Sequence, residues 1–550
     1  MIRFDNVSFR YSADSPRVLR DIDLRLDDGQ LVLVAGPTGS GKSTLLGAIN
    51  GHVPHFTGGI LSGRVTVDGV DTAAQPPRQF AELVGMVRQD PLTGFVTDVV
   101  EEELAYGMEQ LGVEPRAMRA RVEETLDILG LADIRGRALR TLSGGQQQRV
   151  AIGAVLATGV RVLVLDEPTS ALDPVSSEEV LATVLRLVHD IGLTVVIAEH
   201  RLERVAGYAD QMILLDGAGG VVAGDTPSVM AISPLVPPVV ELGRVAEFPT
   251  LPLSVRQARR MSDSLRLELA ELQPEEYPRL PTPALAGQPS APPQCGDPAA
   301  GLTVKDLSVV YGRFAAVTHA TLDFPAGSIT VLMGRNGSGK SSLLWALTGV
   351  QPIAAGSFAV DGTALEAKGT DEVRRYVRLV PQNAGDLLYL DSVEAECAEA
   401  DMTPGSCRRI LDKLTPGIDP SVHPNDLSEG QKLSLVLAIQ LAAQPAVILL
   451  DEPTRGLDYP TKAALAKILR RLADEHRVVV VVTHDVEFAA EVADRIAVMA
   501  AGEVIQTGTA TQILAASALF APQVAKVLYP SHWLTPYQVE QALAWPGGTP

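Results

Sequence analysis

The sequence contains one short stretch twice, and this stretch constrains the fold more than any other feature. Residues 162–168 and 447–453 each consist of four apolar residues followed by Asp-Glu-Pro. An apolar run that stops abruptly predicts a buried strand of a parallel sheet. The two carboxylates, Asp166 and Glu167 in the first copy, then lie at the carboxyl end of that strand, where open α/β sheets bind ligands. One carboxylate can hold Mg²⁺ while its neighbour activates a water molecule, so we expect the same chemistry at two sites.

An internal repeat surrounds the two stretches and sets the number of domains. The matched residues, in chain order, are Lys42 and Lys340, Gln89 and Gln382, Ser143 and Ser428, Asp166 and Asp451, and His200 and His484. The first copy is longer than the second before the serines, and beyond them the two copies stay nearly in step, so the sheet core is shared and the variation is in the insertions. A chain of 550 residues is therefore expected to hold two α/β domains in tandem, each with a parallel core sheet.

The repeat extends beyond these residues into a tail. Residues 238–258 resemble residues 522–541, and each segment reaches a Leu-Ser or Leu-Thr pair that is predicted to cap a short helix. We therefore expect a first domain with its own C-terminal tail at 1–272, a linker rich in Pro and Ala at 273–300, and a second domain with its own tail at 301–550.

In both copies a glycine-rich loop lies between an apolar strand and a helical run. Residues 36–43 and 334–341 match the pattern G-x-x-x-x-G-K-[ST] in this context. The glycines let backbone N–H groups cradle phosphates at a helix N-terminus, the lysine reaches the β- and γ-phosphates, and the serine after it can bind Mg²⁺. The residues expected to contact a nucleotide are Gly36, Thr38, Gly39, Ser40, Gly41, Lys42, Ser43 and Thr44 in the first copy, and Gly334, Asn336, Gly337, Ser338, Gly339, Lys340, Ser341 and Ser342 in the second.

Two pairs of residues near these loops have more than one interpretation. Tyr11 and Tyr311 each follow the first strand of their copy and could stack on an adenine ring, or could simply be half-buried strand residues. Gln89 and Gln382 each follow a strand, where a lone glutamine is usually a loop residue. Only their position between the phosphate loop and the later motifs makes the glutamines candidates for the site.

The second half of each copy adds a histidine and a capped helix. His200 and His484 each end an apolar strand, and their matched positions favour a functional over a structural role. Residues 142–146, Leu-Ser-Gly-Gly-Gln, open a helix at which Ser143 is the expected N-cap and the glycines admit an anion. Because the same domain already has a phosphate loop, this second anion site would serve a nucleotide held by another domain; the alternative is an ordinary capped helix. The candidate contacts are Ser143, Gly144, Gly145 and Gln146 in the first copy and Ser428, Gly430 and Gln431 in the second.

Together these motifs resemble the ATPase of the ATP-binding cassette (ABC) family over nearly the whole chain. They correspond to the Walker A loop, the Q-loop, the LSGGQ signature, the Walker B strand with its glutamate, the D-loop at 170–173 and 455–458, and the H-loop. The resemblance implies ATP and Mg²⁺ as cofactors. It also implies an antiparallel β subdomain and a helical subdomain beside the parallel core sheet of each domain.

In that family two cassettes close head to tail around two ATP molecules. The resemblance therefore implies that the two domains pair within one chain, which would join Lys42 to Ser428 and Lys340 to Ser143. The residues to which it assigns catalysis are Glu167, Glu452, His200, His484, Gln89 and Gln382. Those to which it assigns Mg²⁺ binding are Ser43, Gln89 and Asp166, with Ser341, Gln382 and Asp451 in the second copy.

A finer resemblance is to the ATPases of energy-coupling factor (ECF) transporters, which take up vitamins and transition-metal ions. It rests on residues 89–107, which include Gln-Asp-Pro and Phe-Val, on 50–55 (NGHVPH) and on 198–203 (AEHRLE). It implies a peripheral ATPase at the cytoplasmic face of the cell membrane, with a transmembrane coupling subunit and a substrate-capture membrane subunit as partners. His52 and His55 could suggest a metal site, but a loop without a Cys or carboxylate cluster is a poor one, so we expect none there.

The composition of the chain argues against several other kinds of protein and site. The net charge of −20 argues against a nucleic-acid or ribosomal RNA partner, which would favour a basic face. Three cysteines without a CxxC pair fit a reducing compartment and no metal site, and the N-terminus lacks the apolar core of a signal peptide. Residues 433–450 are apolar, but polar residues and a proline interrupt them, so a buried helix running into a buried strand is expected rather than a membrane span.

Two other functions stay open, and one departure from the family pattern bears on the mechanism. The tandem ATPase of a sugar importer usually has one degraded phosphate loop, which this chain lacks, and an ABC protein acting on the ribosome would have a long charged linker and a basic face. The second signature reads Leu-Ser-Glu-Gly-Gln, with Glu429 in place of the first glycine. A carboxylate facing the γ-phosphate would weaken the site that holds Lys42, whereas an outward-pointing one, which we expect, would be harmless.

Overall fold

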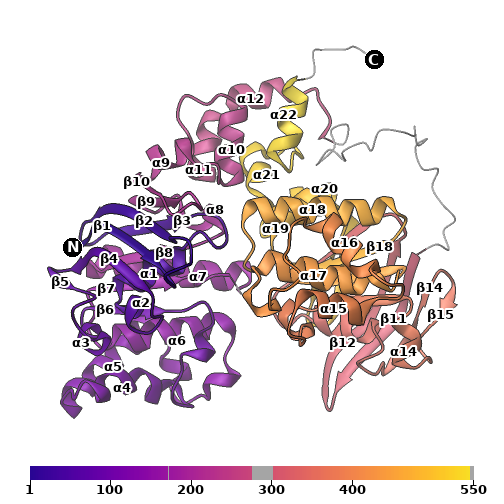
Figure 1. The fold of residues 1–550 in the computed structure, drawn as a ribbon. Coiled ribbons are helices and arrows are strands. Elements are labelled where there is room, and N and C mark those ends of the chain that lie inside the picture. Colours follow the sequence, from indigo (N-terminus) through magenta and orange to yellow (C-terminus); the bar gives the residue numbers. More distant parts are fainter. Residues whose placement is uncertain (171, 275–300, 545–550) are drawn as a thin grey trace. The chain divides into compact units, whose positions relative to one another are not determined.

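The structure is a computed structural model that describes residues 1–170, 172–274 and 301–544 (Figure 1). The chain divides into two compact units, Met1–Pro237 and Pro238–Pro550. The expected linker at 273–300 lies almost entirely outside the described residues, as does Ala171 of the first D-loop.

The first unit is built around a six-stranded sheet in the order β10-β9-β3-β8-β7-β6. Strands β9 to β6 run parallel, and β10 is antiparallel to β9 at the edge. The core strands β3, β7 and β8 are short apolar runs that are buried on both faces, as parallel strands covered by helices must be. The strands of this sheet are β3 (Leu31–Ala35), β6 (Val84–Val87), β7 (Val162–Asp166), β8 (Thr194–Ala198), β9 (Gln211–Leu215) and β10 (Val221–Asp225).

A four-stranded antiparallel sheet, in the order β2-β1-β4-β5, and a group of helices complete the first unit (Figure 1). The apolar face of this sheet shares one hydrophobic core with α1 and the six-stranded sheet, while α4, α5 and α6 pack on one another as the expected helical subdomain. The remaining strands are β1 (Ile2–Arg10), β2 (Leu19–Leu26), β4 (Ile60–Val67) and β5 (Val70–Asp71). The α-helices are α1 (Lys42–Ile49), α2 (His52–His55), α3 (Pro77–Phe80), α4 (Val100–Gln110), α5 (Pro115–Leu129), α6 (Gly144–Leu156), α7 (Pro174–Ile191), α8 (Leu202–Val205) and α9 (Thr226–Ile232), with short 3₁₀ turns η1 (Pro91–Thr93), η2 (Ala132–Ile134) and η3 (Leu139–Thr141).

The second unit repeats this arrangement. Its six-stranded sheet has the order β16-β17-β18-β13-β19-β20, parallel except for β20, and its four-stranded antiparallel sheet has the order β12-β11-β14-β15. The strands are β11 (Gly301–Tyr311), β12 (Phe314–Pro325), β13 (Ile329–Met333), β14 (Ala355–Val360), β15 (Thr363–Ala364), β16 (Val377–Val380), β17 (Val447–Asp451), β18 (Val478–Val482), β19 (Arg495–Ala500) and β20 (Glu503–Thr509). The helices of the cassette are α13 (Lys340–Leu347), α14 (Thr370–Val373), α15 (Val393–Ala400), α16 (Ser406–Leu414), α17 (Glu429–Ala442), α18 (Tyr459–Asp474), α19 (Val486–Val492) and α20 (Ala510–Ala516), with 3₁₀ turns η5 (Ala384–Leu387) and η6 (Pro424–Asp426).

The expected α/β fold is therefore confirmed in both copies, including the antiparallel and helical subdomains. The apolar stretch 433–450 is helix α17 followed by strand β17, as the sequence predicts. Among the described residues, no helix has both the length and the apolar character that crossing a membrane requires.

The two tails pack against each other within the second unit. Helices α10 (Pro238–Val245), α11 (Val255–Met261) and α12 (Asp263–Glu268) come from the first copy, and α21 (Gln523–Leu528) and α22 (Pro536–Ala544) end the second. Helix α10 contacts both α21 and α22, α11 contacts α21, and the Val239 amide donates to Gln523 Oε1 at 3.0 Å. Ser254 and Thr535 cap α11 and α22 as the sequence predicts. The tail that the sequence assigns to the first domain thus packs with its counterpart from the second, beyond the unit boundary at Pro237.

Candidate functional site

Each phosphate loop lies between the central strand of its core sheet and the helix that follows it. In the first unit α1 begins at Lys42, directly after Gly41, whose φ of 98° is left-handed and would strain a residue with a side chain. Lys42 Nζ donates to the carbonyl oxygens of Gly36 and Pro37 at 3.0 and 3.1 Å. The lysine is therefore folded over the loop that the sequence assigns to phosphate binding.

The second unit has the same loop geometry. Lys340 Nζ donates to the carbonyl oxygens of Gly334 and Arg335, both at 2.9 Å, and the N-cap Gly339 again has a φ of 98°. Both lysine side chains are buried, and a buried ammonium group needs oxygen partners. Phosphate oxygens offer the same partner chemistry as these carbonyls, so both loops fit a nucleotide.

The serine after each lysine lies beside the aspartate of the neighbouring strand. A hydrogen bond joins Ser43 to Asp166, and another joins Ser341 to Asp451. Burial raises the pKa of both aspartates, although the serine hydrogen bonds and the nearby lysines oppose this. Asp451 Oδ1 is buried and has no hydrogen-bond partner among the described residues. A hydroxyl beside a buried carboxylate with an unsatisfied oxygen is a donor set that suits Mg²⁺, so the residues fit the ion that the motifs imply.

The glutamate after the first aspartate is held by three polar side chains. Glu167 Oε1 lies 2.8 Å from His200 Nε2, and Gln89 Nε2 donates to Glu167 Oε2 at 3.2 Å. Gln89 also donates to Ser170 Oγ at 3.1 Å, and Ser170 in turn donates to the Glu167 backbone carbonyl. Glu167 has a φ of 50°, an uncommon conformation for a residue with a side chain and one that often marks a functional site. The structure thus brings two predicted residues, Gln89 and His200, to the carboxylate of a third, Glu167.

The second unit keeps the histidine contact but not the glutamine contact. Glu452 also has a φ of 50°, and its Oε2 lies 2.8 Å from His484 Nδ1. Gln382 is exposed, and within the described part of the chain its side chain has no hydrogen bond. Arg455 stands where the first unit has Ser170, so the hydroxyl that accepts from Gln89 has no counterpart. Sequence matching alone did not reveal this difference between the two sites.

Both signature sequences form the predicted capped helix start. Ser143 Oγ accepts from the Gln146 amide at 3.3 Å, and Gln146 Oε1 accepts from the Ser143 amide at 3.0 Å. Ser428 and Gln431 repeat this capping box with the same distances. The second glycine of the signature is required sterically in this copy, because a Cβ on Gly430 would lie 2.6 Å from a Thr461 methyl group.

Glu429, the departure from the signature pattern, points away from the helix start. Its side chain is about half exposed, at 51%, and Glu429 Oε1 lies 3.0 Å from Lys432 Nζ one turn further along α17. Within its own unit the carboxylate is therefore solvated and paired with a positive charge. This geometry agrees with the expected outward orientation.

The two tyrosines proposed for adenine stacking lie at the ends of their strands, about half exposed. Tyr11 Oη lies 2.8 Å from Thr44 Oγ1 in the first turn of α1, so the ring is next to the phosphate-loop helix. Its ring also packs edge-on against Phe9. Tyr311 has a similar exposure at the end of β11. The exposed faces leave room for a stacked base, and the assignment stays a prediction.

In each unit, buried charged side chains hold the turn that carries the histidine. The sequence did not single out these side chains. In the first unit Glu199 Oε1 accepts from Thr169 Oγ1 at 2.5 Å, and Arg204 Nη1 donates to the Thr169 carbonyl at 2.9 Å. In the second unit Lys462 Nζ and Asp485 Oδ2 form a buried ion pair at 2.7 Å. Glu199 precedes His200 and Asp485 follows His484. This adjacency to the histidines was the sequence signal that could have identified both carboxylates. The two copies thus support the same turn with different residues.

The geometry defines a chain with two P-loop nucleotide-binding α/β domains, each with an Asp-Glu pair and a histidine beside the loop. The family model of the ABC transporter matches residues 19–170 and 317–455. A putative ABC transporter ATP-binding protein of Streptomyces avermitilis is 52% identical over 99% of this chain and 100% of its own length.

The chain is also similar to two solved structures. One, cbiO1 from Clostridium perfringens, part of the ABC transporter complex cbiONQ, is 28% identical and covers 42% of this chain and 90% of its own, with a TM-score of 0.39. Another, a model of ribosome-bound archaeal Pelota and ABCE1, is 21% identical and covers 93% of this chain and 80% of its own, with a TM-score of 0.60. The latter likeness shows the fold alone.

The chain belongs to the ABC transporter ATP-binding family, whose members are ATPases.

Proposed function

We propose that the chain is the ATPase of an ECF-type importer that takes up a vitamin or a metal ion through separate membrane subunits. The observation that carries this proposal is a rigid loop, residues 95–97, that presents an apolar tip between two nucleotide-site motifs. An apolar side chain held rigidly at the surface is suited to a partner, because little conformational entropy remains to be lost on binding.

A buried carboxylate fixes this loop. Glu103, on the first turn of α4, is only 5% exposed, and its Oε2 accepts hydrogen bonds from the Val96 amide at 3.1 Å and the Thr97 amide at 2.8 Å. The Thr97 hydroxyl donates to the same oxygen at 2.9 Å. Val96 is nevertheless 62% exposed, and Phe95 beside it is partly exposed. The loop is thus anchored from inside while its apolar tip faces solvent.

The second unit uses the same anchor with a different tip. Glu396 Oε1, also buried, accepts from the Tyr389 and Leu390 amides at 2.5 and 2.7 Å. Tyr389 is 76% exposed. Two similar but unequal tips suit two similar but unequal contact sites on membrane subunits.

The nucleotide sites supply the driving reaction in this proposal. Lys42 and Lys340 bind the phosphates, and Ser43 with Asp166 (Ser341 with Asp451) would hold Mg²⁺, which neutralises developing charge on the phosphates when it is bound. Glu167 and Glu452 polarise the attacking water, and the histidine 2.8 Å from each carboxylate orients it. The signature serines, Ser428 and Ser143, complete the sites of Lys42 and Lys340 respectively.

Membrane association tests the proposal. In cells of the source organism, the double substitution Phe95→Asp and Val96→Asp is expected to release the chain from the membrane fraction and to leave basal ATP hydrolysis unchanged. Val222→Asp, at an exposed position on the edge strand β10, is the matched control and should stay at the membrane.

Membrane association of the double variant equal to that of the wild-type chain would refute the proposed loop contact. Recovery of the wild-type chain with ribosomes instead of membrane proteins would favour the ribosomal function. Sequencing the membrane proteins that co-purify distinguishes a vitamin or metal-ion importer from a sugar importer.

A further inference from the structure

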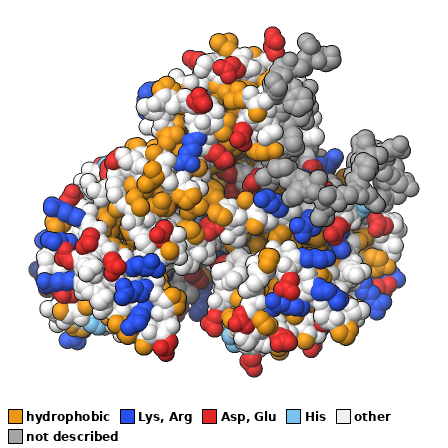
Figure 2. Space-filling view, turned by 45° about the horizontal axis from the view of Figure 1, so that its top comes forward, with side chains coloured by type: hydrophobic (Ala, Val, Ile, Leu, Met, Phe, Trp, Pro, Cys, Tyr) orange, Lys and Arg blue, Asp and Glu red, His pale blue; other side chains and the backbone are white. Residues whose placement is uncertain are grey.

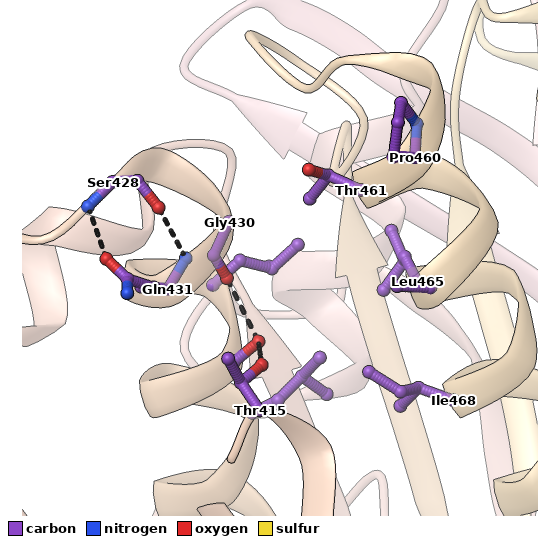
Figure 3. Close-up of a pocket in the computed structure, with 12 residues that line it drawn as sticks. Thr415, Ser428, Gly430, Gln431, Pro460, Thr461, Leu465 and Ile468 are labelled. Carbon is purple, nitrogen blue, oxygen red and sulfur yellow. Dashed lines mark hydrogen bonds between the residues drawn. The ribbon is translucent and has the colours of Figure 1, made fainter. Parts of the chain in front are cut away.

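A cavity of about 280 Å³ lies directly behind the second signature, between α17 and α18 (Figure 3). Leu433 and Leu437 on α17 and Leu465 and Ile468 on α18 form its apolar walls. Figure 3 shows Leu465 and Ile468 pointing across the gap toward α17. The cavity belongs wholly to the second unit.

At the matching place in the first copy, a charged side chain of α6 pairs with a carboxylate of α7. Arg149 on α6 donates to the Leu129 carbonyl at 3.3 Å and lies 3.5 Å from Glu179 on α7, so α6 and α7 are in contact along this line. Counted from the signature serines, Ser434 stands at the position of Arg149 and Ala464 at the position of Glu179. Both replacements line the cavity. The second copy thus lacks both partners of this ion pair at the place where the cavity lies.

The hydroxyl groups of Thr415 and Ser434 on the cavity wall already have hydrogen-bond partners. Thr415 Oγ1 donates to Ser434 Oγ at 2.7 Å, and Ser434 Oγ donates to the Gly430 carbonyl at 2.9 Å (Figure 3). Of the described residues that line the cavity, none is Asp, Glu, Lys or Arg. A charged ligand would lose its hydration there without gaining a counter-charge, which is costly. The wall instead suits an aliphatic chain, with the hydroxyl of Thr461 and the amide of Gln431 near the helix starts to receive one polar head group.

The volume sets the size of the occupant. An engineered cavity of about 150 Å³ holds benzene, with six carbon atoms, so about 280 Å³ has room for roughly eleven heavy atoms. We propose that this cavity is a binding site for an uncharged amphiphile of about nine to eleven heavy atoms, with an aliphatic chain and a single hydroxyl or amide head. The proposal does not rest on the transport role, although Ser428, Gly430 and Gln431 of the second signature also line the cavity.

Calorimetric titration of the full chain with 1-octanol tests the site, and octanoate is the charged control of equal chain length. We expect one saturable site per chain for 1-octanol, at least tenfold weaker binding of octanoate, and a Kd that falls about fourfold per methylene from 1-hexanol to 1-octanol, as expected from about 0.8 kcal/mol per buried methylene. Absence of saturable binding, or equal binding of octanoate, would overturn the proposal.

Variants locate the binding in this cavity. Ala464→Leu fills the space with an aliphatic group, and the pair Ser434→Arg with Ala464→Glu rebuilds the ion pair of the first copy; each should weaken 1-octanol binding at least tenfold. The pair Arg149→Ser with Glu179→Ala should open the matching cavity in the first unit and raise the stoichiometry from one to two. Unchanged 1-octanol binding in either filled variant would place the binding elsewhere and refute the site.

Discussion

Glu491 on α19 gives a pH dependence that can be worked out in sign and size. Burial raises the pKa of this carboxyl to about 7, and the negative charges of Glu241 and Asp485 add to the effect, while Lys462 and Lys467 oppose it. The ordinary value is 4.5. The folded chain therefore holds this proton over a pH range in which the unfolded chain has lost it.

The sign of the effect on stability follows from this difference. A raised pKa in the folded state means that the stability contribution is fully present below pH 4.5 and is lost as the pH rises toward 7. At about 1.36 kcal/mol per pKa unit, ionised Glu491 costs the second unit about 3 kcal/mol at pH 8. Glu491→Gln removes the ionisation and should stabilise this unit by up to that amount at pH 8, but by less than about 1 kcal/mol at pH 5.

Urea unfolding of the full chain between pH 5 and pH 8 measures this prediction. The quantity to compare is the difference in the free energy of unfolding between Glu491→Gln and the wild-type chain, followed as a function of pH. Glu366→Gln, at an exposed position, is the control and should show no such difference. A difference that is constant across this range, or a destabilised Glu491→Gln chain at pH 8, would refute the reasoning.

Three further predictions concern the nucleotide sites and the loop contact. Changing both Glu167 and Glu452 to Gln should leave ATP binding intact and lower turnover by about 10²- to 10⁴-fold, measured by nucleotide binding and phosphate release; near-normal turnover would show that these are not the bases. Lys42→Ala and Lys340→Ala should lower ATPase activity to a similar extent, because Glu429 in the signature proposed for the Lys42 site points outward and pairs with Lys432; a clearly larger loss from Lys340→Ala would show that the glutamate impairs the Lys42 site. Glu103→Ala removes the acceptor of three loop hydrogen bonds, so the loop amides should exchange with solvent about tenfold or more faster in hydrogen-exchange measurements, and unchanged exchange would mean that other contacts hold the loop.

Motif order predicted much of this structure because the motifs are local and their contexts are specific. The strand ending in Asp166 and Glu167, the capping box at Ser143 and the helix that runs into β17 all depend on residues close in sequence. The matching of Gln382 to Gln89 failed to predict its contacts, and one of the two acceptors of Gln89 is a serine that the second copy replaces with Arg455. Matching the two copies of the repeat shows which residues correspond. It does not show whether the hydrogen-bond partners of those residues are also the same in both copies.

The partner of each tail was also hidden from the sequence. Residues 238–258 and 522–541 are similar to each other, so the sequence is consistent with each tail packing on its own cassette. It is equally consistent with the two tails packing on each other, because sequence similarity does not show which pairing has the lower free energy. The structure joins them through contacts such as Arg266 Nη2 with the Val527 carbonyl at 2.6 Å. Figure 2 shows one face of the molecule, on which hydrophobic and charged side chains are interspersed. This surface pattern does not identify the pairing of the two tails either.

The pairing of the two tails has a consequence for subunit stoichiometry. Because α10 and α11 pack on α21 and α22, cleavage between residues 275 and 300 would leave the two halves joined by this helix contact. If the copies were separate polypeptides with the same tails, two first copies or two second copies could also associate, in proportions set by their concentrations. Joined in one chain, the first tail meets the second at an effective concentration on the order of millimolar. The two tails that pair within one chain are therefore always unlike, and every molecule contains one unmodified signature and one signature with Glu429.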